Sequence, residues 1–366
     1  GSQQLMQSFA IALAQGGYRA IIFDFPGHGQ SARPMDGGLE ERARRNAQLE
    51  AALGEVVAYA EGRFGGPVGL LGHSMGSEVV ARYAQSDPSI AATVGVSLVY
   101  EGVTPDSPRN LLALTGAWEP QLIPLALAVA PGGAPGVTSG SFEDGTARRA
   151  VLVPGAEHIG VLFSGTSMAE SEAWFRAAMP PDPAPHAPDL AGIGYGTVGA
   201  RMPALGLMFV GAILLFWPLS ALLQPIGPVA GRALPLGRWA WWGAVLVPAL
   251  LTPLLLRFVP AQGLLPILVG GPLALFFLIY GLLTLAGLAV GRLARRRQPA
   301  PDERRPGVGE RLGTWRRGVM MALAVALLVV GYVFLGFGLP AQLAVLNYFP
   351  PAPRLPVFLA VLAAML

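Results

Sequence analysis

The second half of this 366-residue chain carries four long apolar stretches, one after another. A helix crosses the hydrocarbon core of a bilayer with about 20 predominantly apolar residues, so each stretch is long enough to span, although internal prolines can kink or shorten a helix. Four such stretches are hard to bury in one soluble globule. A fifth stops after 11 residues, at the end of the chain. We therefore predict that residues 201–366 form a transmembrane region with about four full spans and a truncated fifth. The five stretches cover residues 204–223, 239–256, 264–290, 318–339 and 356–366.

Charge is divided unevenly between the two halves of the chain. Residues 1–200 contain 11 Arg and 19 acidic residues, a net charge of −8, whereas residues 201–366 contain 14 Arg and 3 acidic residues, a net charge of +11. An acidic first half argues against nucleic acid as a partner. The chain has no Cys, which excludes disulfides, thiolate metal sites and cysteine nucleophiles. We expect neither a metal nor a cofactor.

Arg residues concentrate between the predicted third and fourth spans, where residues 291–317 contain nine of them. This pattern is typical of a cytoplasmic loop, because Arg-rich loops stay on the cytoplasmic side; a nucleic-acid patch is the alternative. Counting back places the loop with Arg232 and Arg238 inside and residues 1–200 outside. We therefore predict a multi-pass protein of the cell membrane with an extracytoplasmic first half, which requires a targeting segment or span before residue 1. Loss of one of the first three spans would reverse the side.

The predicted spans offer few ionisable groups for transport. After residue 200 the only acidic residues are Asp302, Glu303 and Glu310, all in the Arg-rich segment, and there is no His. Proton relays and ion paths need ionisable groups inside the membrane. We therefore expect an anchor or scaffold rather than a coupled transporter. A lipid-presenting groove or a platform for a partner stays open.

Residues 1–179 alternate between strand-like and helix-like segments. Strands separated by helices predict a parallel sheet with helices on both faces, which is an α/β fold. Residues 180–200 are rich in Pro and Gly and read as a linker to the predicted membrane region. The expected strands cover residues 18–25, 68–71, 94–100, 110–115 and 149–153, and the expected helices residues 3–15, 39–63, 77–85, 120–130 and 166–179.

A serine lies between two glycines at the junction of an expected strand and an expected helix. The motif is Gly72-His73-Ser74-Met75-Gly76, a G-x-S-x-G sequence. In a nucleophile elbow the serine sits on a strained turn that exposes its hydroxyl, and the small flanking residues let the turn close. The helix N-terminus behind the serine favours negative charge. The pattern predicts that Ser74 is a nucleophile rather than part of a structural turn.

A second motif lies after the expected strand 18–25. The sequence from Asp24 to Ser31, DFPGHGQS, matches a D-x-x-G-x-G-x-S turn, and the elbow follows it. With these two motifs, residues 1–178 resemble the α/β-hydrolase superfamily, closest to its esterases, monoacylglycerol-lipase-like enzymes and serine aminopeptidase-like proteins. The resemblance implies an N-terminally truncated domain, with up to three strands before residue 1. One of them would end in an HG-type motif that supplies half of the oxyanion hole.

A serine hydroxyl needs a general base, and the base needs a carboxylate that orients it. The chain has four His. The resemblance places the base on the loop after the last strand, which is the position of His158. His28 lies in the D-x-x-G-x-G turn, His186 lies in the linker, and we expect the side chain of His73 to point away from the neighbouring Ser74.

The carboxylate should follow a strand between the serine and the base. Glu119 ends the sequence GAWE after the expected strand 110–115, which resembles the strand-G-x-x-D arrangement of the family, with Glu in place of Asp. Glu101 and Asp106 follow the preceding strand and remain alternatives. The backbone N–H of Met75, directly after the nucleophile, is expected to be one donor of the oxyanion hole.

These features predict a membrane-anchored serine hydrolase that cleaves an ester, thioester or amide through an acyl-enzyme. The substrate class is a small-molecule, lipid or peptide acyl compound, and the short segment 100–110 predicts an open site without a helical cap. A catalytically inactive hydrolase-like binding domain is one alternative, but such a module has no reason to keep all three triad residues. An acyltransferase, in which an alcohol or amine replaces water, is the other.

Overall fold

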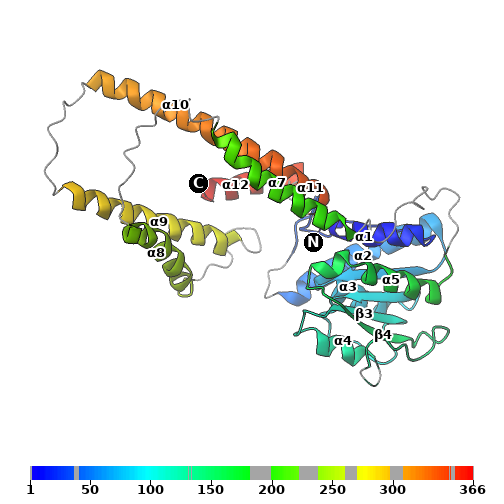
Figure 1. Ribbon diagram of the computed structural model, residues 1–366. Coiled ribbons are helices and arrows are strands. Elements are labelled where there is room, and N and C mark those ends of the chain that lie inside the picture. Colours follow the sequence, from blue (N-terminus) through cyan, green and yellow to red (C-terminus); the bar gives the residue numbers. More distant parts are fainter. Residues whose placement is uncertain are drawn as a thin grey trace. The chain divides into compact units, whose positions relative to one another are not determined.

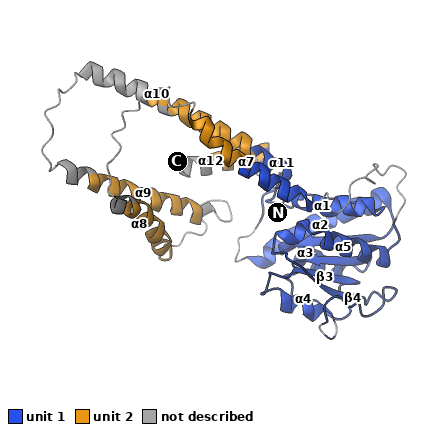
Figure 2. Cartoon of the chain, viewed as in Figure 1, with its two compact units in different colours: residues 1–210, 339–351 blue, residues 211–338, 352–366 orange. Residues whose placement is uncertain are grey.

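The computed structural model describes two compact units within the chain (Figure 2). One unit comprises Gly1–Val210 and Leu339–Pro351, and the other comprises Gly211–Gly338 and Ala352–Leu366. The described residues are 2–36, 41–130, 132, 134–181, 199–221, 238–259, 270–296, 308–345, 347 and 351–365.

The first unit is built on a parallel sheet, which has four strands in the part of the chain that the structure describes (Figure 1). The spatial order follows the sequence: β1 Val68–His73, β2 Ile90–Val96, β3 Leu111–Gly116 and β4 Arg148–Val153. All three neighbouring pairs are parallel. Because parallel strands all point one way, their carboxyl ends meet at one edge of the sheet, and the residues that follow each strand come together there.

Helices cover both faces of this sheet, as the alternation of segments predicts. Along β3, Leu112 and Leu114 pack into the cluster formed with α1 (Gln3–Gln15) and α5 (Gly165–Ala178). The alternate residues Leu111 and Ala113 pack into a separate cluster with α4 (Ile123–Val129). Successive side chains of a strand point to opposite faces, so two such clusters require two covered faces. The predicted parallel sheet with helices on both faces is therefore confirmed.

A third cluster joins β1 to the helices that precede and follow it in the sequence. α2 (Arg42–Phe64) contributes Leu49 and Leu53, and α3 (Met75–Ser86) contributes Val79 and Val80. Leu70 of β1 packs into the same cluster. α3 is therefore held against the strand from which it departs, and this packing fixes the direction of the turn between them.

Two strand predictions are wrong. Residues 18–25 form no strand, because they make no ladder with β1 or with another described strand, and an extended segment without a partner is not part of a sheet. The apolar character of the segment is still used, since Phe23 and Phe25 pack against the α2–α3 cluster. The second strand covers Ile90–Val96 instead of 94–100, because the backbone turns at Ser97, whose φ is +48°.

The C-terminal region is helical. Its longer helices are α7 Arg201–Ala221, α8 Arg238–Leu256, α9 Gly270–Arg296 and α10 Val308–Val333. After α10 come η3 Phe334–Gly338, α11 Leu339–Ala344, η4 Ala352–Arg354 and α12 Leu355–Met365.

Within the described residues, three helical segments are long and apolar enough to cross a membrane: Arg201–Ala221, Pro272–Gly291 and Val319–Ala344. Trp242–Leu256 is a shorter apolar helix. Many apolar side chains of this region are exposed, such as Trp217 at 83% and Leu327 at 72%. Such surfaces are compatible with membrane spans. Residues 182–198 of the predicted linker, residues 297–307 of the Arg-rich segment, Arg232 and His186 lie outside the described residues.

Candidate active site

Ser74 occupies a sharp turn between β1, which ends at His73, and α3, which begins at Met75. Its φ is +54°, a conformation that is uncommon outside glycine and costs on the order of 1–3 kcal/mol. Hydrogen bonds hold the turn: the Ser74 N–H donates to the Val96 carbonyl at 2.9 Å, and the Ser74 carbonyl accepts from the N–H and the hydroxyl of Ser77 at 2.8 and 2.6 Å. The strain predicted for the elbow is therefore present.

The two glycines of the motif do not serve the turn equally. A Cβ on Gly72 would lie 2.2 Å from the carbonyl oxygen of Gly76, which no side chain tolerates. A Cβ on Gly76 would meet no atom within 4 Å. Gly72 is thus required because the backbone of residue 76 passes directly over it. The sequence predicts that both glycines let the turn close, and the structure shows a close backbone contact at Gly72 but not at Gly76.

The structure brings Ser74, His158 and Glu119 together. His158 Nε2 lies 3.0 Å from Ser74 Oγ, and His158 Nδ1 lies 2.6 Å from Glu119 Oε1. With the ring hydrogen on Nδ1 donating to the carboxylate, Nε2 is free to accept the serine proton. Glu101 and Asp106, the alternatives for the carboxylate, are exposed, and Glu119 is the acidic residue whose side chain contacts His158.

Glu119 is 1% exposed, so its carboxylate must be satisfied by protein groups. While Oε1 faces His158, Oε2 accepts from the hydroxyl of Ser97 at 2.9 Å and from the N–H of Gly116 at 2.7 Å. Both donors follow from local structure: Ser97, with its positive φ, comes directly after β2, and Gly116 is the last residue of β3. Sequence reasoning missed Ser97, because its contact with Glu119 joins the ends of two different strands.

The loop after β4, which carries His158, is hydrogen-bonded to the turn after β3, which carries Glu119. The N–H groups of Ala117 and Trp118 donate to the carbonyls of Val153 and Ala156 at 2.9 and 3.0 Å. Within the loop, the Glu157 carboxylate accepts from the N–H groups of residues 159 and 160 at 2.8 and 2.6 Å, and so caps the short helix η1 Gly160–Phe163. Glu119 and His158 are therefore held by neighbouring, mutually bonded turns.

His73 is the site residue whose contact sequence reasoning missed. Its Nε2 lies 2.8 Å from the backbone oxygen of His158, and the two imidazole rings lie 4.7 Å apart at 46°. Burial lowers the pKa of His73 to about 4. The other described histidine, His28, contacts the Pro26 carbonyl through Nδ1 at 3.0 Å, inside its own turn.

The D-x-x-G-x-G turn is organised by Asp24. One carboxylate oxygen accepts from the N–H of Gln3 at 2.7 Å, and the other accepts from the N–H of Gln30 at 2.9 Å. Gly29 has a φ of +44°, and a Cβ there would lie 2.3 Å from the Asp24 carboxylate. The motif thus ties the start of α1 to the turn through one acidic side chain.

Met75 is the first residue of α3, where N–H groups have no partner inside the helix and the helix dipole favours negative charge. The expected role of its N–H as a donor of the oxyanion hole stays a prediction. The structure leaves the second, HG-type donor that the resemblance implies without an assigned residue. In the described ranges, no three His, Asp or Glu residues come together in a way that could hold a metal ion.

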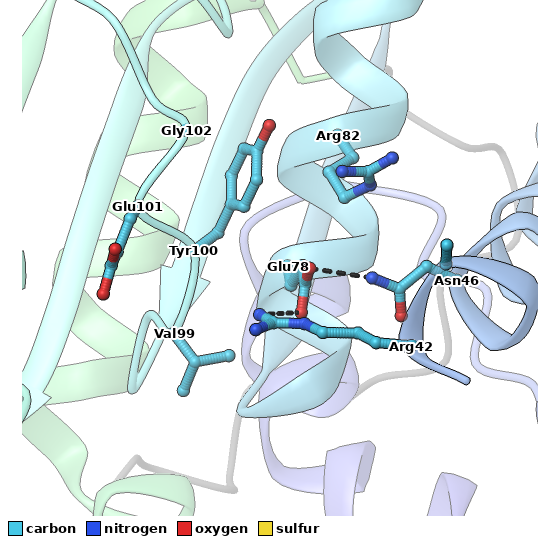
Figure 3. Close-up of a pocket in the computed structure, with 9 residues that line it drawn as sticks. Arg42, Asn46, Glu78, Arg82, Val99, Tyr100, Glu101 and Gly102 are labelled. Carbon is cyan, nitrogen blue, oxygen red and sulfur yellow. Dashed lines mark hydrogen bonds and ion pairs between the residues drawn. The ribbon is translucent and has the colours of Figure 1, made fainter. Parts of the chain in front are cut away.

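A pocket of about 470 Å³ is lined by residues of α2, of α3 and of the segment 99–102 after β2 (Figure 3). At its centre the buried Glu78 accepts from Arg42 at 2.8 Å and from Asn46 at 2.7 Å, both on α2. Arg82, one turn further along α3, pairs with a Glu50 carboxylate oxygen. Ser74, His158 and Glu119 are not among the residues that line this pocket.

The comparison with protein families agrees with this geometry. Residues 2–138 match the family model described as serine aminopeptidase, S33, a branch of the α/β-hydrolase superfamily. The match covers the elbow and Glu119 but ends before His158. No curated protein matches the chain. The family match indicates that the N-terminal region is a hydrolase.

Proposed function

We propose that this chain is a membrane-anchored serine hydrolase that cleaves an ester, thioester or amide through an acyl-enzyme on Ser74. The observation that carries the proposal is the continuous chain of contacts from Ser74 Oγ through His158 to the buried Glu119. The family match supports a hydrolase independently of that geometry.

The proposed reaction begins with attack of Ser74 Oγ on the acyl carbon, while His158 Nε2 takes the hydroxyl proton. Glu119 stabilises the imidazolium that forms, and the Met75 N–H stabilises the oxyanion of the tetrahedral intermediate. Collapse of the intermediate breaks the bond to the leaving group, which receives the proton from His158. Water then attacks the acyl-enzyme by the same route, releasing the acid and regenerating Ser74.

A buried carboxylate argues against the alternative of a binding module without activity. The buried Glu119 side chain is satisfied by Ser97, Gly116 and His158, and a protein that used this region for binding alone would gain nothing from that arrangement. Transfer to an alcohol or amine shares the acylation step. Product analysis with added acceptors separates it from hydrolysis.

The family match makes a short peptide amide the first substrate to assay, beside ester and thioester analogues. Lipid acyl substrates remain part of the proposed class because of the proposed membrane anchor.

The test is covalent labelling of the full chain in detergent with a fluorophosphonate probe. We expect labelling of the wild type and none of Ser74→Ala. Ser86→Ala is the matched control, because Ser86 is an exposed serine at the other end of α3 and should leave labelling unchanged. Labelling that persists in Ser74→Ala would exclude Ser74 as the nucleophile.

We also propose that the C-terminal helices anchor the protein in the cell membrane, with the hydrolase region extracytoplasmic. The three long apolar helices support the anchor. The side depends on whether α8 crosses, and its 19 residues would extend roughly 28 Å at 1.5 Å per residue, close to the thickness of a hydrocarbon core.

A further inference from the structure

We propose that His73 is a positioning residue that ties the loop of the general base to the elbow of the nucleophile. This inference rests on the proposed function of Ser74 and His158. His73 touches no reacting atom. It acts through the backbone of His158, to which its side chain is bonded.

The contact joins the two parts of the site directly. His73 is the last residue of β1 and is covalently bonded to Ser74. Its Nε2–H donates to the backbone oxygen of His158 at 2.8 Å, and the rings lie 4.7 Å apart. Because a carbonyl oxygen can only accept, the hydrogen bond requires the tautomer with hydrogen on Nε2. One side chain thus connects the backbone next to the nucleophile with the backbone of the base.

The end of β1 and the loop after β4 are not held together by a direct strand pair in the sheet. β1 carries the nucleophile and the loop after β4 carries the base, and in the strand order β1 and β4 are separated by β2 and β3. The other backbone hydrogen bonds of the loop that carries His158 go to the turn after β3, which carries Glu119, and to η1. The bond from His73 therefore joins the end of β1 directly to the loop that carries His158, beside the contact between Ser74 and His158.

The charge state of His73 suits this position. Its burial, the largest cause, lowers its pKa to about 4, so the ring is neutral at neutral pH. A neutral ring adds no positive charge beside His158 when that residue takes the serine proton. The hydrogen bond to the His158 backbone raises the pKa of His73 and so opposes burial, while a charged His158 lowers this pKa and Glu119 raises it.

Two substitutions separate the hydrogen bond from the bulk of the ring. In His73→Gln the side-chain amide reaches about as far as Nε2 and can still donate to His158. In His73→Phe the ring remains but the donor is lost. Both are made in the full chain, together with Ser86→Ala as the control. The measurements are kcat and KM for a chromogenic ester, the rate of fluorophosphonate labelling, and the midpoint of thermal unfolding.

We expect His73→Phe to lower kcat and the labelling rate by about 10–100-fold with KM changed less than about 3-fold, because a displacement near 1 Å can cost 100-fold. His73→Gln should restore the rate to within about 3-fold of the wild type, although its unfolding midpoint need not return. Rescue of the rate by Gln is the result that a role in packing alone would not give.

Wild-type rates in a folded His73→Phe would overturn the proposal. Rates in His73→Gln as low as in His73→Phe would overturn it as well, because the donor would then be irrelevant. If His73→Phe does not fold, His73→Asn replaces it, since its shorter amide cannot reach the same carbonyl. Failure of the wild type to label, or labelling of Ser74→Ala, is a separate result that refutes the proposed function and this inference with it.

Discussion

Replacing Glu119 by Gln should reverse the tautomer of His158. Oε2 of Glu119 accepts from Ser97 Oγ and from the Gly116 N–H, and the N–H of Gly116 can only donate. In Glu119→Gln the amide oxygen must therefore take the Oε2 position, which places the NH₂ group 2.6 Å from His158 Nδ1. Two donors cannot face each other, so the hydrogen of His158 moves to Nε2 and points at Ser74.

A base that carries its hydrogen on Nε2 cannot accept the serine proton. We expect Glu119→Gln to lower kcat by about 10³–10⁴-fold, which corresponds to about 4–5 kcal/mol of transition-state stabilisation, with little change in unfolding temperature. Rates of ester hydrolysis and of fluorophosphonate labelling measure the loss. Glu119→Asp is the control, since it keeps an acceptor opposite Nδ1 and should retain more activity than Gln. A Glu119→Gln protein within tenfold of the wild type would refute the tautomer argument.

Three further predictions follow from other features of the chain. His73 has a folded-state pKa of about 4 against an ordinary 6.5, so its contribution to stability is present above pH 6.5 and is lost as the pH falls towards 4. Over that pH range the free energy of unfolding of the wild type should fall by about 3 kcal/mol more than that of His73→Gln. Urea unfolding at each pH measures the difference. Gly72→Ala should abolish probe labelling or folding, because its Cβ would meet a carbonyl at 2.2 Å, whereas Gly76→Ala should label like the wild type; equal behaviour of the two variants would contradict the assigned role of Gly72. Protease added to intact spheroplasts should digest residues 1–200 and spare the Arg-rich segment 291–317, and protection of the hydrolase region until the membrane is permeabilised would show that the proposed side is wrong.

The parts of the site that sequence could predict are those set by local patterns. The elbow is a contiguous motif in which strand, serine and helix follow one another, so Ser74 and its turn could be placed without a structure. His158 and Glu119 needed the resemblance, because their positions after later strands become meaningful only in a known order of strands. The choice of Glu119 over Glu101 is a geometric result, since both follow strands but only one meets His158.

Two features that the sequence could not predict depend on contacts between segments far apart in the chain. Residues 18–25 have the apolar composition of a strand, but a strand needs a neighbour, and composition does not say whether one lies beside it. The sequence predicts that the side chain of His73 points away from Ser74. It does not reach Ser74, but it bonds the backbone of His158, a contact that depends on how a loop 85 residues later folds back over β1.

The order of the strands also makes the site a reporter of folding. Serine, carboxylate and base follow β1, β3 and β4, which include both outer members of the described sheet. A refolding intermediate that has formed only β1 to β3 contains a nucleophile and a carboxylate but no base. Reactivity towards a fluorophosphonate should therefore appear only when β4 has docked. The rate at which reactivity appears after dilution from denaturant would then report the docking of β4 and not the collapse of the core.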